Sequence, residues 1–121
     1  MNLFVGPQAP SQWSLTVETF TSALRERWPA ARVTPIDDPS DSELLKFALD
    51  GDEGPVEGAL TRTGRILILE YGWPRDLASV VVLFRRLAPA AEDLVMVNEG
   101  GGAYAVIRVD TGLDEVTAVL S

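Results

Sequence analysis

The sequence predicts an α+β fold in which helices pack on an antiparallel sheet of about five or six strands. Three observations lead to this fold class. Two segments repeat apolar residues at helical spacing, several shorter segments alternate or run apolar as strands do, and tight-turn residues separate them. Short turns join antiparallel neighbours, so we expect the order α-β-β-β(-β)-α-β-β-α. With 121 residues, of which 46% are hydrophobic, the chain has the size of one domain spanning residues 1–121.

The first predicted helix begins near Ser11, which follows Pro10 and suits an N-cap position. It ends at Trp28, because Pro29 disfavours helical geometry in the residue before it. The apolar residues of its buried stripe recur at spacings of three and four: Trp13, Val17, Phe20 and Leu24.

The strand-like segments follow this helix, apart from one at the N-terminus. We expect the strands of the sheet at residues 32–36, 43–49, 56–61, 66–69, 94–97 and 103–109, and the short apolar run 3–5 is also strand-like but is not counted among them. Pro35 indicates an edge strand, and the segment 66–69 is apolar on both faces, as central strands are. Leu45, Phe47 and Leu49 would share one face of a strand, although part of the same segment also fits helical spacing.

The second predicted helix has clear signals at both ends. Pro74 suits the first turn and Asp76 suits the positive end of the helix dipole. Arg85 and Arg86 occupy the last turn before Pro89. Its expected buried stripe consists of Leu77, Val80, Val81, Phe84 and Leu87. A third, short helix is predicted over residues 113–120.

The composition argues against catalysis. The chain contains no histidine and no cysteine, so the usual general base near neutral pH and the best nucleophile are missing. We therefore expect no enzyme, no catalytic residue, no cofactor and no metal site. A cysteine-free chain suits the reducing cytoplasm. The N-terminal apolar run is too short for a signal peptide, and no stretch of 18 apolar residues exists, so we expect no membrane association.

The formal net charge of −8 bears on partners. A negative surface repels phosphate backbones and anionic lipids, so nucleic acid and membranes are disfavoured. The complementary expectation is another protein, in particular a basic one. Solubility alone accounts for such a charge equally well.

Two motifs resemble known sites and are better explained structurally. Asp110-Thr111-Gly112 matches the core of the aspartic-protease signature, but only nine residues follow it. We interpret Thr111 as the cap of the last helix, with Asp114 supporting the first turn. The run from Gly100 to Ala105 fits a dinucleotide-binding pattern, but a strand follows where a helix is needed, so its glycines are read as a hairpin turn.

Two acidic segments invite a metal-site interpretation. The run from Asp50 to Gly54 resembles the start of a calcium loop, yet Thr61 stands where a bidentate glutamate is required. We interpret this run as a solvated hairpin turn. A second cluster would hold a hard cation only loosely, and a charged loop needs no such role: Asp37, Asp38, Asp41 and Glu43.

The strongest candidate for a binding site lies between the central strand and the second helix. It consists of Glu70, Tyr71, Trp73 and Arg75. Aromatic and arginine side chains are the types enriched at interaction hot spots. The alternative is that Tyr71 and Trp73 cover the end of the sheet as the rim of the core.

These features favour a non-catalytic protein-binding module. In size, charge and layout the chain resembles the immunity proteins of bacterial toxin systems. Its element order also resembles the acidic dimeric chaperones of type III secretion. That resemblance implies a dimer contact through the helix that carries Val82 and Leu83, and strand surfaces that hold an unfolded client. A homodimer is thus an open alternative. A further alternative is a small-ligand sensor or enzyme with its site at residues 70–75.

Overall fold

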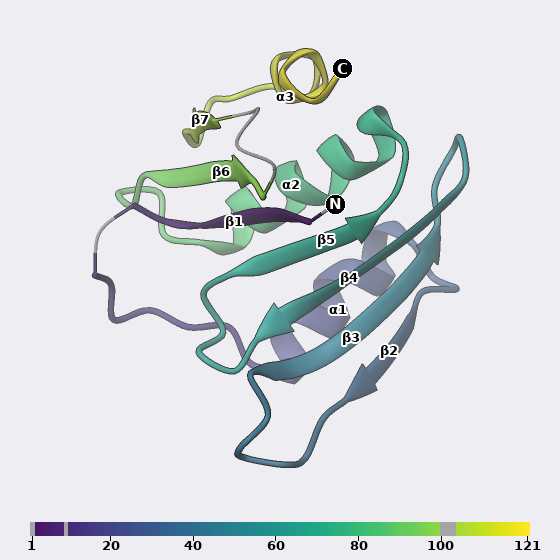
Figure 1. The fold of residues 1–121 in the computed structure, drawn as a ribbon, viewed down its shortest axis with the longest axis vertical. Helices are drawn as coiled ribbons and strands as arrows, with labels where there is room; N and C mark the ends of the chain where they lie inside the picture. The colour runs from purple at the N-terminus through teal and green to yellow at the C-terminus, as the bar shows by residue number, and fades with distance from the viewer. Residues whose placement is uncertain (1, 9, 100–103) are drawn as a thin grey trace.

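The computed structural model describes residues 2–8, 10–99 and 104–121. Within these residues the chain forms seven strands and three helices, and the sheet is antiparallel throughout (Figure 1). The predicted α+β class is therefore confirmed. No helix in this described part is long and apolar enough to cross a bilayer.

The sheet has the strand order β2-β3-β4-β5-β1-β6-β7. Its strands are β1 (Leu3–Pro7), β2 (Arg32–Pro35), β3 (Glu43–Asp50), β4 (Pro55–Thr61), β5 (Leu67–Tyr71), β6 (Leu94–Asn98) and β7 (Tyr104–Ile107). The edge position of β2 and the interior position of β5 agree with the sequence prediction. The expected five or six strands fall short of the observed seven, because the N-terminal segment enters the sheet between β5 and β6.

Three helices accompany the sheet: α1 (Val17–Arg27), α2 (Pro74–Leu87) and α3 (Leu113–Leu120). In Figure 1, α1 and α2 both lie behind the sheet, and α3 lies at its β7 end. Helix α3 packs mainly against α2. The sheet thus has one face covered by helices and one open face.

The core fills the space between the sheet and the helices. Leu45, Phe47 and Leu49 of β3 are all buried and alternate with residues that are not, which confirms the strand and excludes the helical alternative. Phe47 meets Phe20 of α1 at a ring-centroid distance of 5.5 Å. An aromatic pair of this geometry helps to fix the helix on the sheet.

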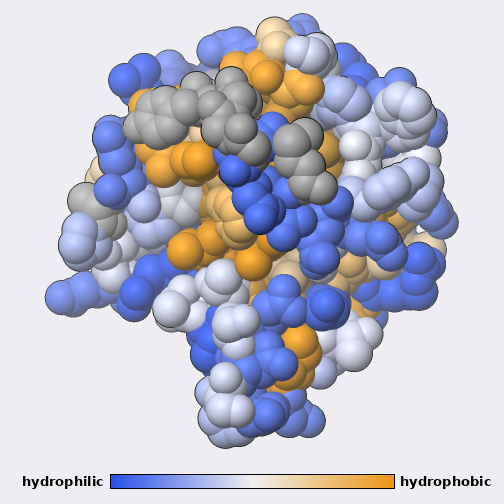
Figure 2. Space-filling view, in the orientation of Figure 1, coloured by the Kyte–Doolittle hydropathy of each residue, from blue (hydrophilic) through white to orange (hydrophobic). Residues whose placement is uncertain are grey.

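The open face of the sheet is apolar on some strands and basic on others. Residues that alternate with the buried ones belong to this face, and on β1, β5 and β6 they include the apolar Phe4, Ile68 and Val97. Figure 2 shows apolar surface gathered on this side among polar atoms. On β2 and β3 the same face carries Arg32 and Lys46.

The first helix begins later than the sequence predicts. Its N-cap is Thr16, whose Oγ1 accepts the N–H of Thr19 at 3.1 Å, whereas the hydroxyl of Ser11 donates to Glu92. The reason is tertiary: the N–H of Leu15 donates to the carbonyl of Gly64 at 2.9 Å. That contact holds residues before Thr16 in an extended path along the β4–β5 turn, out of the helix.

The last helix has the predicted bounds but a different cap. Gly112 is its N-cap, and its N–H donates to Glu115 Oε1 at 3.2 Å. Thr111 instead accepts the N–H of Arg108 at 2.8 Å and closes the preceding turn. Thr111 lies one residue before the N-cap, and its side chain bonds to Arg108, so it does not cap the helix. The glycine turn predicted at residues 100–102 lies outside the described residues.

Candidate functional site

Tyr71 and Trp73 stand at the junction of strand and helix that the sequence indicates. Tyr71 is the last residue of β5, and Trp73 is the N-cap of α2 with no side-chain capping hydrogen bond. Each of the two residues is 56% exposed. They therefore present aromatic surface to solvent rather than closing the core.

The loop between β3 and β4 lies against this pair. A Cβ atom added to Gly54 would lie 3.0 Å from Cδ1 and Nε1 of Trp73, so the indole rests on the bare backbone of this glycine. On the neighbouring strand, Glu57 is the cross-strand partner of Tyr71. Trp73 thus lies against the β3–β4 loop, and Tyr71 is next to β4 through its strand pairing.

The carboxylate of Asp76 holds the β3–β4 loop in place through hydrogen bonds. It is buried, and its carboxylate accepts the backbone N–H groups of Asp52 at 2.9 Å, Glu53 at 3.0 Å and Gly54 at 3.1 Å. Gly51 leaves room for the carboxylate, because a Cβ atom there would collide with it. The sequence indicates only a helix-dipole role for Asp76, since its partners lie 22–24 residues away in the chain.

The surroundings of the two aromatic residues are acidic. The amides of the loop turn inward to Asp76, and the side chains of Asp52 and Glu53, next to Gly54 in sequence, are exposed. Glu57, the cross-strand partner of Tyr71, is exposed as well. We call these five residues the aromatic–acidic surface: Tyr71, Trp73, Asp52, Glu53 and Glu57. This surface combines flat apolar groups with three carboxylates on a backbone held in place.

The other two residues of the predicted site have different neighbours. Arg75 forms an exposed ion pair with Asp114 of α3, with 3.5 Å between Nη1 and Oδ1. Glu70 is exposed and lines an open hollow of about 250 Å³ with Tyr71. Among the predicted site residues, Trp73 therefore meets the acidic loop and Tyr71 pairs with β4, whereas Arg75 faces α3 and Glu70 lines an open hollow.

The acidic segment after β2 is organised by an arginine. Arg62 donates through Nη2 to the carbonyls of Ile36, Asp38 and Glu43 at 2.7–2.9 Å. The backbone N–H and hydroxyl of Ser40 donate to Asp38 and hold the pKa of that carboxyl below its ordinary value. Within the described residues, no group of three or more acidic side chains is placed to bind a metal ion.

A buried arginine ties the end of α2 to the last strands. Arg85 donates to the carbonyls of Pro89, Glu92 and Ile107. Burial lowers the pKa of this guanidinium from its ordinary value, and the nearby carboxylates of Asp93 and Glu92 act in the opposite direction. The role is structural, beyond the dipole contact that the sequence predicts.

Comparison with known proteins gives no relative: no family model, no curated protein and no solved structure matches the chain.

Proposed function

We propose that the protein is a non-catalytic binding module that holds a basic segment of another protein on the aromatic–acidic surface. The observation that carries the proposal is the exposure of Tyr71 and Trp73, 56% for each residue, next to a hairpin that carries three exposed carboxylates. Large aromatic residues contribute most when a partner buries them, and they are enriched at interaction hot spots.

The chemistry of this surface favours a cation. A lysine or arginine over the face of a tryptophan or tyrosine gains about 0.5–1 kcal/mol when exposed and about 2 kcal/mol when desolvated. Carboxylates at Asp52, Glu53 and Glu57 supply acceptors for the same cationic groups. The net charge of −8 adds long-range attraction for a basic partner.

The fixed loop supports a binding role. The three hydrogen bonds from residues 52–54 to Asp76 hold the loop before a partner arrives. A surface that is already ordered loses less conformational entropy on binding. A binding module of this kind needs neither histidine nor cysteine, and a cysteine-free chain suits a partner in the cytoplasm. Such a function is that of an inhibitor or immunity-type protein.

Photo-crosslinking in the native cell tests this proposal. We would place p-benzoylphenylalanine at Tyr71, and at the exposed Glu18 of α1 as a control on another element. The proposal predicts a protein adduct from position 71 that weakens when the salt concentration is raised and that is absent from position 18. No adduct from position 71, or the same adduct from both positions, contradicts it.

A second candidate function is retention of an unfolded protein by a dimer. The specific observation that favours it is the apolar surface on the open sheet face at Phe4, Ile68 and Val97. The helix residues proposed for self-association, Val82 and Leu83, are both partly buried on α2. Light scattering decides this alternative: a dimer mass supports it, and a monomer at all concentrations removes it.

A further inference from the structure

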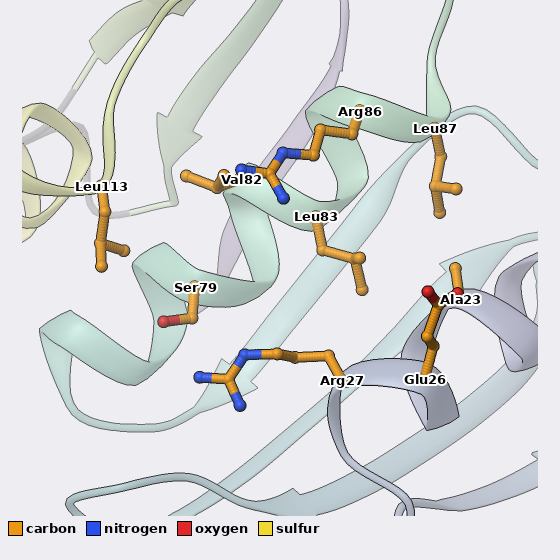
Figure 3. Close-up of a pocket in the computed structure, with 9 residues that line it drawn as sticks. All are labelled: Ala23, Glu26, Arg27, Ser79, Val82, Leu83, Arg86, Leu87 and Leu113. Carbon is orange, nitrogen blue, oxygen red and sulfur yellow. The ribbon is translucent and has the colours of Figure 1, made fainter.

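A groove crosses the helical side of the molecule, away from the junction that carries Tyr71 and Trp73. It measures about 540 Å³ and lies between α1, α2 and the start of α3 (Figure 3). Its apolar lining comes from three helices: Ala23, Val82, Leu83, Leu87 and Leu113. We call this feature the helix groove. Its volume lies in the range of about 300–1,000 Å³ that is usual for binding clefts.

The rim of the helix groove is positive in an otherwise acidic protein. Arg27 and Arg86 line it from α1 and α2, and one carboxylate, Glu26, accompanies them. In Figure 3, Leu83 lies between the side chains of Arg86 and Arg27. A ligand in the groove would thus meet apolar groups at the centre and guanidinium groups at two sides.

These two arginines differ from most other cations of the described chain. Arg25, Arg62, Arg65 and Arg85 donate to backbone carbonyls, and Lys46 and Arg75 form ion pairs. Within the described residues, the side chain of Arg86 has no ion pair or hydrogen bond. In this part of the chain, the only contact of this kind for the Arg27 guanidinium is with the Trp28 ring, whose centroid lies 4.9 Å from Cζ. Two guanidinium groups on one apolar groove are therefore available to a ligand.

We propose that the helix groove binds an amphipathic helix of another protein whose apolar face is flanked by carboxylates. A helix presents apolar side chains at i, i+3, i+4 and i+7, which fits a groove between helices. Charge complementarity selects acidic flanks, because a guanidinium pairs with a carboxylate in a bidentate geometry. The overall negative charge opposes such a ligand, but screening over about 8 Å at physiological salt leaves the close contacts dominant.

The test uses two synthetic 18-residue helical peptides that share a leucine stripe and differ only in glutamates or lysines along its edges. The proposal predicts that the glutamate peptide binds, seen by fluorescence anisotropy. It also predicts that this peptide shifts the methyl signals of Val82, Leu83 and Leu113 in the unmodified protein. Absence of these shifts at millimolar peptide, or equal binding of the lysine peptide, overturns it.

Two matched double variants distinguish the effect of the arginines on the groove rim from the effect of the protein's net charge. The double variant Arg27→Ala/Arg86→Ala should weaken the glutamate peptide about two- to thirty-fold. The control Arg32→Ala/Arg108→Ala removes the same charge from exposed positions outside the groove and should leave binding unchanged. Equal weakening by both variants overturns the proposal. Because all four side chains are exposed, the fold should survive, which circular dichroism checks.

Discussion

Replacing Asp76 with asparagine should loosen the loop that carries Asp52 and Glu53 of the aromatic–acidic surface. Asp76 is 3% exposed, and its carboxylate accepts three N–H groups at 2.9–3.1 Å. Hydrogen bonds to a charged group contribute about 1.5–3 kcal/mol each, but their simple sum is too large here. The amide side chain in the Asp76→Asn variant would keep one acceptor oxygen, and water reaches the exposed loop residues. We expect a loss of about 2–3 kcal/mol in the free energy of unfolding.

Urea unfolding followed by tryptophan fluorescence measures this loss, and hydrogen exchange of the amides of residues 52–54 shows where it arises. The control is Asp114→Asn, which also removes a carboxylate from the first turn of a helix. Its ion pair with Arg75 is exposed, so the change should stay within about 1 kcal/mol. If Asp76→Asn has no larger effect than the control and the three amides exchange as before, the anchoring argument is refuted.

Three further predictions concern stability and protonation. Arg85→Met should cost about 2–4 kcal/mol in urea unfolding because three carbonyls lose the hydrogen bonds that the guanidinium donates, while the exposed neighbour Arg86→Met should stay within about 0.5 kcal/mol. Gly64 has φ of 72° and no room for a Cβ atom, so Gly64→Ala should lower the melting temperature, by an amount equivalent to about 1–3 kcal/mol. Ser40→Ala should raise the pKa of Asp38 in an NMR titration. Because the pKa of Asp38 in the folded protein lies below the ordinary 3.8, its hydrogen bonds with Ser40 stabilise the fold above pH 3.8. This stabilisation is lost as the pH falls through the folded pKa.

Local signals predict some elements of this fold very well. The bounds of α2 follow from Pro74 at its start and Pro89 beyond its end, and the buried face of β3 follows from alternation. These signals act within one turn or one strand, so no tertiary contact is needed to read them. The bounds of α3 are likewise local, although its cap shifts by one residue to Gly112.

The remaining features depend on contacts that are distant in sequence. The first helix starts at Val17 because Leu15 bonds to Gly64, a residue 49 positions later. The segment 3–5 reads as a strand, but nothing in it indicates a place between β5 and β6. Sequence alternation predicts faces of strands, whereas strand order depends on how the whole sheet assembles.

The candidate site also combines features that local sequence predicts with features that depend on distant contacts. Residue type drew attention to Tyr71 and Trp73, yet their exposure depends on how β5 and α2 meet. The link from Asp76 to the β3–β4 loop spans more than 20 residues and has no motif. The helix groove likewise joins side chains from three separate helices.

The affinity of the crosslinked partner for variants of Tyr71 and Trp73 shows whether these two side chains bind it. Isothermal titration would compare the unmodified protein, Tyr71→Ala/Trp73→Ala, and the control Val109→Ala, which removes another exposed apolar side chain. We predict that the double variant weakens binding about 100-fold, or about 2.8 kcal/mol, while its melting temperature falls by no more than about 5 °C. Unchanged affinity of the folded double variant would show that the partner does not bind through Tyr71 and Trp73.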